Sequence, residues 1–263
     1  MTKYAFDNTW EKARLRLRGI EALFDPGTIQ HMERCGIAEG WHCLEVGAGG
    51  GSITEWLCQH VGTEGSVLAT DIDTRFVEAL DYPNLAILRH DIVKDVFPEH
   101  VFDLIHTRMV LCHLPERDSA LRRMVAALKP GGWLICEALD NLSMVLVSPT
   151  DEASQALYLK IEGAVGKAMA ARGHMYDYGR RLSGIFCSHG LMDVQSEGRV
   201  FLRQAGMRTQ VVRLTVEQLR EDILGAGLAT EADIEAYFAL LDNPTFTAVG
   251  PTLFAAWGRR AAA

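Results

Sequence analysis

Apolar and polar positions alternate in blocks along the first half of the chain. Short apolar runs are separated by stretches in which apolar residues recur every three or four positions. The short runs predict buried strands, and the recurring pattern predicts amphipathic helices. We predict strands at residues 41–46, 66–69, 86–89, 102–106 and 133–138, and helices at residues 52–60, 74–80 and 117–128. Apolar strands that alternate with helices indicate a parallel sheet with helices on both faces.

The two ends of the chain depart from this rhythm. An amphipathic helix is predicted at residues 8–23, ended by Asp25-Pro26-Gly27, with a second helix at 28–35. Beyond Asp140 we predict a helix at 150–171, a strand at 191–202, helices at 215–224 and 231–241, and a strand at 251–257. We therefore divide the chain into an N-terminal helical lid (1–35), a core (36–140), a helical cap (141–190) and a C-terminal part that completes the core sheet (191–263).

Charge and composition exclude some classes of partner. The formal net charge is −8, and an acidic surface repels a phosphate backbone, so we expect no nucleic-acid partner. The polar segment from Met1 to Trp10 lacks the apolar core of a signal peptide, and no apolar run reaches the roughly 18 residues of a membrane span. The six cysteines form no CxxC pair and are interpreted as buried thiols. We expect a cytoplasmic protein with no membrane partner; nothing in the sequence specifies an oligomeric state.

The strongest candidate for chemistry is the glycine-rich segment Glu45-Val46-Gly47-Ala48-Gly49-Gly50-Gly51, which lies between the first strand and its helix. Glycines let the backbone turn sharply and let a ligand approach the main chain. Asp71 ends the second strand, 20 residues beyond Gly51, where a carboxylate can accept both hydroxyls of a ribose. Asp91-Ile92 follows the third strand, where a carboxylate and an aliphatic side chain can hold an adenine. The pattern predicts a cofactor that contains adenosine.

Two cofactors fit this pattern, and the spacing separates them. A nicotinamide dehydrogenase also combines a glycine loop with an acidic residue about 20 positions on. Its glycines are spaced G-x-G-x-x-G, however, whereas here they run G-x-G-x-G. Glu45 would also lie beside the pyrophosphate of a dinucleotide, a contact between like charges. A sulfonium cofactor with an ammonium group suits that carboxylate better.

Residues 40–140 resemble the class I S-adenosylmethionine-dependent methyltransferases. The run Leu-Glu-Val-Gly-Ala-Gly-Gly-Gly at 44–51 is similar to their first motif, and Phe-Asp-Leu-Ile-His-Thr-Arg at 102–108 is similar to their fourth-strand motif. Leu-Lys-Pro-Gly-Gly-Trp-Leu at 128–134 resembles the turn into the fifth strand in the ubiquinone/menaquinone and small-molecule branches, and residues 253–258 resemble the antiparallel seventh strand. The resemblance implies an α/β fold: a doubly wound, mostly parallel, seven-stranded, Rossmann-like sheet with a helical cap.

The same resemblance implies S-adenosylmethionine as the cofactor, and it assigns a set of residues to it. These are Tyr4, in an N-terminal segment similar to one that closes over the cofactor, together with Glu45, Gly47, Ala48, Gly49, Asp71, Ile72, Asp91, Ile92, Thr107 and Arg108. The implied function is transfer of a methyl group to oxygen, nitrogen or carbon of a small-molecule acceptor, such as a secondary metabolite or a quinone-like compound. The alternative is a protein that binds S-adenosylmethionine for regulation or for non-methylating chemistry.

Residues that act on the acceptor are less clearly marked. His113 follows the fourth strand and is a candidate general base, although the same position commonly belongs to a structural loop. His106 is expected in the core. Glu137 and Asp140 leave the fifth strand and either face the acceptor or, as expected by default, are solvated or capping carboxylates. In the cap, Tyr176 and Tyr178 either line an acceptor pocket or lie at the entry of a surface helix.

Two related site types are not expected. Asp140-Asn141 resembles the magnesium pair of catechol-type methyltransferases, but Thr107-Arg108 occupies the place of the further aspartate that those enzymes need. We therefore expect no metal. Enzymes that methylate exocyclic amines of bases carry an Asn/Asp-Pro-Pro-aromatic run after the fourth strand, and this chain has Met-Val-Leu-Cys at 109–112.

Overall fold

The computed structural model describes residues 6–262, which fall into two compact units built from alternating segments of the chain. The first unit contains the N-terminal residues through Leu23, then Asp140–Asp177 and Arg199–Thr252. The second unit contains Phe24–Leu139, Tyr178–Gly198 and the C-terminal residues from Leu253.

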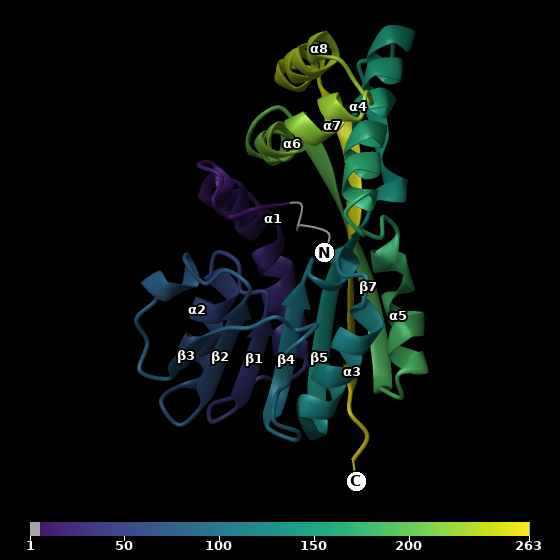
Figure 1. The fold of residues 1–263 in the computed structure, drawn as a ribbon. Helices are drawn as coiled ribbons and strands as arrows, with labels where there is room; N and C mark the ends of the chain where they lie inside the picture. Colours follow the sequence, from purple (N-terminus) through teal and green to yellow (C-terminus); the bar gives the residue numbers. More distant parts are fainter. Residues whose placement is uncertain (1–5, 263) are drawn as a thin grey trace. The chain divides into compact units, whose positions relative to one another are not determined.

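The second unit is built on a mostly parallel sheet. Hydrogen-bonded strands follow the order β3-β2-β1-β4-β5-β8, and Figure 1 shows the first five side by side. The pairs β1–β2, β1–β4, β2–β3 and β4–β5 are all parallel. Their bounds are β1 His42–Val46, β2 Ser66–Asp71, β3 Leu85–Arg89, β4 Phe102–Arg108, β5 Leu128–Asp140 and β8 Thr247–Arg259; β7, Met192–Gln204, also pairs with β8.

The edge between β5 and β8 is antiparallel. The Gly131 N–H donates to the Arg260 carbonyl at 3.0 Å, and the Arg260 N–H donates to the Gly132 carbonyl at 2.9 Å. These bonds join the start of β5 to the residue after the end of β8, so the two strands run in opposite directions. A Cβ on Gly132 would lie 2.9 Å from the Phe102 carbonyl oxygen, so only glycine fits this irregular start of β5.

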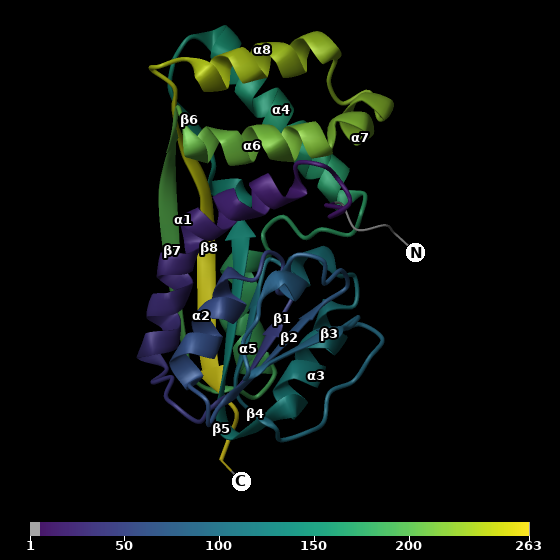
Figure 2. The same ribbon diagram turned by 90° about the vertical axis from the view of Figure 1, so that its left-hand side faces the viewer.

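Helices cover both faces of this sheet, as the alternating pattern predicts. The C-terminal half of α1 (Ala13–Arg34) and α2 (Ser52–Val61) pack on one face, over buried apolar side chains of β1, β4, β5 and β8. Figure 2 shows α2 on this face and α3 (Arg117–Ala127) on the other, where α5 (Tyr178–Ser188) also lies. Short 3-10 turns follow β2 and β4: η1, Val77–Ala79, and η2, Leu111–His113.

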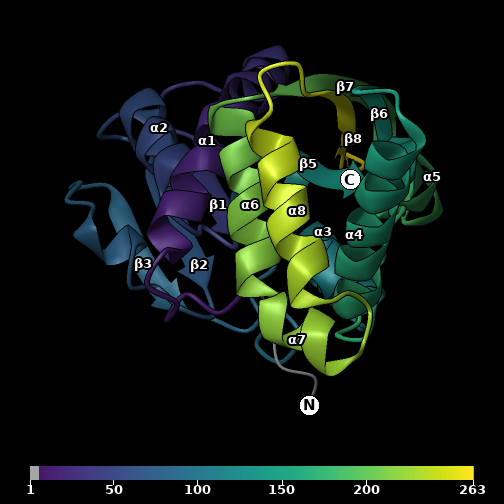
Figure 3. The ribbon, with the colours of Figure 1, turned by 90° about the horizontal axis from the view of Figure 1, so that it is seen from above.

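The first unit is mainly helical. It contains the N-terminal half of α1, the turn η3 (Asn141–Ser143), α4 (Glu152–Ala170), α6 (Met207–Gln218), α7 (Arg220–Gly225) and α8 (Glu231–Asp242). Figure 3 shows α6 and α8 side by side, and α4 and α8 pack through a shared apolar core. Strand β6 (Val145–Ser148) pairs antiparallel with the first part of β8.

The predicted α/β fold is confirmed, with some local differences. All seven predicted strands are present, and β6 is an additional short strand. The predicted stop at Asp25-Pro26-Gly27 is wrong, because α1 continues through Pro26 to Arg34. Proline removes one helical hydrogen bond, but Asp25 and Thr28 on either side are fixed by side-chain bonds to the sheet. The predicted helix at 74–80 is also wrong, since only the short turn η1 forms there.

The two units divide the chain differently from the predicted lid, core and cap. Residues 24–35 of the predicted lid and 178–190 of the predicted cap belong to the second unit, together with the sheet. Residues 199–252 belong to the first unit. The difference arises because α1, β7 and β8 are long elements that each contribute residues to both units. In the described residues, no helix is both long enough and apolar enough to cross a bilayer.

Candidate functional site

The glycine loop after β1 is fixed to the end of β2 by backbone hydrogen bonds. The N–H groups of Gly47 and Ala48 donate to the Thr70 carbonyl at 2.7 and 3.0 Å. Gly47 has φ +78°, and a Cβ there would lie 2.2 Å from Val110 Cγ2. Gly51 has φ +90° and is the N-cap residue of α2. The loop therefore needs glycine both for its backbone conformation and for close approach, as a cradle for a ligand requires.

Asp71 lies beside this loop at the carboxyl end of β2. Its Oδ2 accepts the Gly49 N–H at 2.9 Å, and its Oδ1 accepts the Asp73 N–H at 3.0 Å. Burial raises the pKa of Asp71 above its usual value, although these N–H groups act in the opposite direction. The following residue, Ile72, is 47% exposed. The carboxylate and loop form one constellation at the sheet edge where parallel α/β folds bind ligands.

Asp91 and Ile92 follow β3, the next strand of the sheet. Asp91 Oδ1 accepts the Val93 N–H at 3.0 Å, and its Oδ2 pairs with Lys94 Nζ at 2.5 Å. The Lys94 ammonium helps to hold the pKa of Asp91 below its usual value, against the opposing effect of burial. Ile92 is buried. Asp91 thus follows the strand that pairs with the one ending in Asp71.

Glu45 is placed beneath the loop and is almost completely buried, with 4% of its surface exposed. The Thr54 hydroxyl, on α2, donates to Glu45 Oε2 at 2.5 Å. Glu45 Oε1 lies 3.6 Å from Nδ1 of His106, its neighbour on β4. Glu45 therefore supports the loop from below through side chains of α2 and β4.

Thr107 and Arg108 end β4 and both bond to protein groups. The buried Thr107 hydroxyl donates to the Val46 carbonyl at 2.9 Å, which joins β4 to the strand that carries the loop. Arg108 donates to Thr28 Oγ1 at 2.9 Å and to Asp25 Oδ1 at 2.7 Å, both on α1. Their structural contacts fix the strand end and α1.

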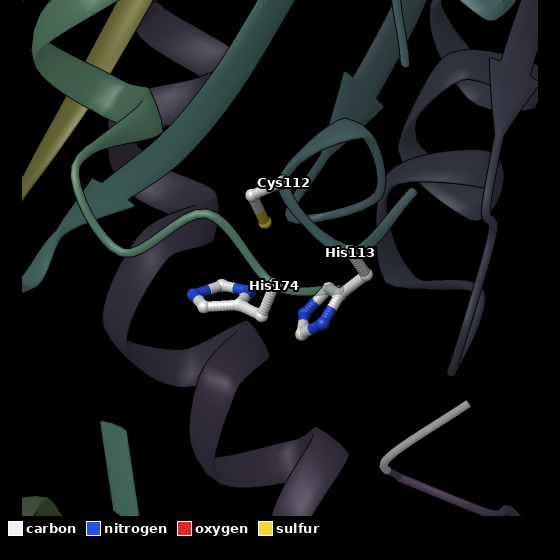
Figure 4. A group of neighbouring side chains, drawn as sticks. All are labelled: Cys112, His113 and His174. Atoms are coloured by element: carbon white, nitrogen blue, oxygen red, sulfur yellow. The ribbon is translucent and has the colours of Figure 1, made fainter. Parts of the chain in front are cut away.

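His113 lies on the turn η2 after β4, next to Cys112, and is partly exposed (Figure 4). Burial raises the pKa of the Cys112 thiol to about 12, so this cysteine is not a thiolate nucleophile near neutral pH. His174, also drawn in Figure 4, belongs to the first unit. His113 therefore lies at the edge of the sheet where parallel α/β folds bind ligands, and its role as a general base stays a prediction.

The two tyrosines predicted for the acceptor belong to different units. Tyr178 begins α5 in the second unit and is 1% exposed, so its side chain packs in the core. Tyr176 lies in the first unit, and its hydroxyl donates to the Glu162 carbonyl at 3.2 Å. The Glu162 carboxylate also accepts from Arg203 at 2.6 Å and from the Tyr237 hydroxyl at 2.7 Å. Tyr176 thus borders a buried polar cluster of that unit. Tyr4, the remaining predicted residue, lies outside the described residues.

The structure reveals a buried group of charged side chains that the sequence did not indicate. Glu137 was expected to be solvated or capping, but it is 1% exposed, on β5. His31 Nδ1 lies 3.0 Å from Glu137 Oε1, and Thr28 donates to Oε2 of the same carboxylate. His106 is buried as predicted, and its Nε2 lies 3.6 Å from Glu137 Oε2. Burial favours a raised pKa for Glu137, but His106 and His31 reverse this and lower it.

Asp140, at the end of β5, is also buried, and its Oδ1 accepts the Leu142 N–H at 3.2 Å. It therefore caps the turn η3, one of the two roles expected for it.

Comparison with known proteins agrees with this geometry. Residues 44–136, which carry the glycine loop, Asp71, Asp91 and the end of β4, match the family described as a methyltransferase domain. Over this segment the chain is similar to the class I S-adenosylmethionine-dependent methyltransferases, as its motifs indicate. The sheet order and the flanking helices are those of the Rossmann-like fold expected for that class.

Two curated relatives and one solved structure illustrate the likeness. Methyltransferase str2 of Strobilurus tenacellus is 37% identical over 37% of this chain and 35% of its own length. The ubiquinone/menaquinone biosynthesis C-methyltransferase UbiE of Pseudomonas paraeruginosa is 29% identical over 55% of this chain and 59% of its own length. A phosphoethanolamine N-methyltransferase 2 of Haemonchus contortus, solved with S-adenosylhomocysteine, shares the fold with a TM-score of 0.57 and 15% identity, covering 97% of this chain and 59% of its own. The matches span less than two thirds of these relatives.

Proposed function

We propose that this protein binds S-adenosylmethionine and transfers its methyl group to oxygen, nitrogen or carbon of a small-molecule acceptor. One observation carries the proposal: the glycine loop and Asp71 are hydrogen-bonded together at the carboxyl edge of the sheet, inside the segment that matches the methyltransferase domain. Parallel α/β sheets bind ligands at this edge.

The residues present suit each part of the cofactor. The cradle formed by Gly47 and Gly49 has no room for a Cβ at its first position, and it would receive the methionine end. Asp71 would accept the ribose hydroxyls, and Asp91 with Ile92 would hold the adenine. Glu45 would contribute negative charge beneath the loop. When bound, the cofactor supplies a carbon activated by its sulfonium, so the chain mainly has to orient the acceptor and exclude water.

The acceptor is proposed to be a small, partly apolar molecule such as a quinone-like compound or a secondary metabolite. The name of the UbiE relatives, biosynthesis C-methyltransferases of ubiquinone and menaquinone, supports a quinone-like acceptor. His113 is the candidate base if the acceptor must lose a proton, since it follows β4 at the same sheet edge. We also propose that the protein acts in the cytoplasm, because its six cysteines are unpaired and five of them are buried.

A two-stage experiment tests the proposal. Calorimetry with S-adenosylmethionine, S-adenosylhomocysteine and NAD⁺ should detect binding of the first two ligands only. The protein is then incubated with methyl-deuterated S-adenosylmethionine and a panel of phenols, quinols and amines, and products are sought by mass spectrometry. A deuterated methyl group on one acceptor class supports methyl transfer. Failure to bind S-adenosylmethionine would refute the cofactor assignment.

Binding without transfer would point to the alternative function, a protein that uses S-adenosylmethionine for regulation or non-methylating chemistry. The variant His113→Gln then tests whether His113 acts as a base in turnover without contributing to cofactor binding. We expect this variant to bind the cofactor with unchanged affinity and to lose turnover only for acceptors that must be deprotonated.

A further inference from the structure

Three ionisable side chains lie in a row across adjacent strands of the second unit. Glu45 on β1 and His106 on β4 are paired in the sheet register, and on β5 Glu137 lies two residues beyond Ile135, the register partner of His106. The His106 ring lies between the two carboxylates, with Nδ1 3.6 Å from Glu45 and Nε2 3.6 Å from Glu137. No more than 5% of any of these side chains is exposed. Each end of one imidazole therefore faces a buried carboxylate.

The row is favourable only if the imidazole carries a proton on both nitrogens. A buried carboxylate without a counter-charge is costly, and here two of them flank a single ring. Burial alone would lower the pKa of His106, but its contacts with Glu137 and Glu45 reverse this and raise it above the usual value. An imidazolium at His106 then compensates both carboxylates.

Other polar groups fix the two ends of the row. At one end, the Thr54 hydroxyl of α2 holds Glu45 Oε2. At the other end, Thr28 and His31 of α1 hold Glu137, and Arg108 bonds to Thr28 and to Asp25. Nε2 of His31 lies 3.9 Å from the carboxylate of Glu197 on β7, and that carboxylate forms an ion pair with Arg34. The buried thiols of Cys58 on α2 and Cys136 on β5 also interact with Glu45 and Glu137, and burial raises the pKa of both thiols.

We propose that His106 is a positioning residue of the cofactor site, which holds Glu45 beneath the glycine loop and links it through Glu137 to the C-terminal half of α1. The proposal rests on the proposed binding of S-adenosylmethionine. Glu45 is two residues before Gly47, so its position sets the negative charge that the cationic end of the cofactor would meet. Loss of the His106 proton leaves Glu45 held at Oε2 by Thr54 alone, so Oε1 is no longer fixed and the interaction with the cofactor weakens.

The expected pH dependence follows from the direction of the pKa shift. Because the pKa of His106 is raised in the folded protein, the contacts of its protonated ring with Glu45 and Glu137 are fully present below pH 6.5 and are lost as the pH rises through the folded value. The amino group of the cofactor itself titrates equally for every variant. The ratio of dissociation constants between His106→Gln and the wild type should therefore be largest near pH 6 and fall toward one at high pH.

Calorimetry with S-adenosylmethionine tests this with four proteins: wild type, His106→Gln, Glu137→Gln and the double variant. We expect about tenfold weaker binding for His106→Gln at pH 6.5, consistent with loss of one buried ionic contact at 3.6 Å. Glu137→Gln should weaken binding in the wild-type background but not in the His106→Gln background, because its effect passes through His106. The matched control is Ile105→Val, a substitution at the buried residue that precedes His106 on β4. It should leave the affinity unchanged.

A pH-independent ratio, or additive effects of the two substitutions, would show a merely structural role and overturn the proposal. A measurement on the wild type covers the case in which a variant does not fold: in ¹⁵N-histidine spectra with sequence-specific assignment, the His106 ring should titrate above pH 6.5. A His106 ring that titrates at or below pH 6.5 also overturns the proposal. If wild-type protein fails to bind S-adenosylmethionine, the proposed function fails; if it binds and His106→Gln binds equally well, only this inference fails.

Discussion

Replacing Asp71 by alanine tests the candidate cofactor site most directly. The carboxylate accepts the Gly49 N–H at 2.9 Å and the Asp73 N–H at 3.0 Å, so the substitution frees two backbone donors beside the glycine loop. It also removes the group that would accept the ribose hydroxyls. The structure therefore predicts two separable effects, one on the stability of the loop and one on cofactor affinity.

The size of each effect can be worked out from the number of bonds. A hydrogen bond to a charged group contributes roughly 1.5–3 kcal/mol. Loss of one such bond to the ribose corresponds to weaker binding by about tenfold to a hundredfold, since about 1.4 kcal/mol is a factor of ten. For the loop, the burial that raises the pKa of Asp71 offsets part of the two backbone bonds. We therefore expect the free energy of unfolding to fall by about 1–2 kcal/mol, within the usual range for a single substitution.

Calorimetry with S-adenosylmethionine measures the first effect, and urea unfolding followed by circular dichroism measures the second. Asp73→Ala is the matched control, because it removes a carboxylate only two residues away. The Asp73 carboxylate binds Arg75. We expect the control to bind within about twofold of wild type, as expected for an exposed ion pair. Equal affinities for Asp71→Ala and wild type, in a folded protein, would refute the assignment of Asp71 to the ribose.

Two further predictions concern the glycine loop and the first unit. Gly47→Ala should destabilise the protein by about 1–3 kcal/mol in urea unfolding and abolish measurable cofactor binding. Residue 47 has φ +78°, and a Cβ there would lie 2.2 Å from a valine side chain. The control is Gly36→Ala, where φ is +77° and no atom lies within 4 Å of the new Cβ, so only the smaller cost of the backbone conformation is expected. Tyr237→Phe should cost about 1.5–3 kcal/mol in urea unfolding, since its hydroxyl donates to buried Glu162 at 2.7 Å. Tyr158→Phe removes a buried hydroxyl that interacts with Arg203 but makes no hydrogen bond of standard geometry among the described residues, so it should cost less than Tyr237→Phe, and equal costs for both tyrosines would contradict this account.

The sheet could be predicted from the sequence because its strands are short, apolar and separated by helical patterns. The glycine loop, Asp71 and Asp91 each lie at the carboxyl end of a strand or directly after it. Because these strands are parallel, all three lie at the same edge of the sheet. Strand β6 has only four residues, and its pairing with β8 depends on a partner about 100 residues away. Such a strand has no signal of its own.

The interior of the candidate site could not be predicted in the same way. His106 was expected in the core, but a single sequence does not show that carboxylates on two neighbouring strands face its ring. The same limitation explains α1. Proline at 26 ordinarily ends a helix, and only the contacts of Thr28 and Asp25 with distant residues show why this one continues. Tertiary interactions thus decided both features.

The continuity of α1 through Pro26 has a consequence for how the protein can be divided. The helix passes from one unit to the other at residues 23 and 24, and the chain changes unit again at 139/140, 177/178, 198/199 and 252/253. Neither unit is therefore encoded by a contiguous piece of the gene. Removal of residues 1–24 would take away Phe6 and Ala13, both buried, together with half of a helix whose other half contacts Glu137. Domain exchange with related enzymes would have to graft a discontinuous set of segments, and a single-crossover chimaera would carry two incomplete cores.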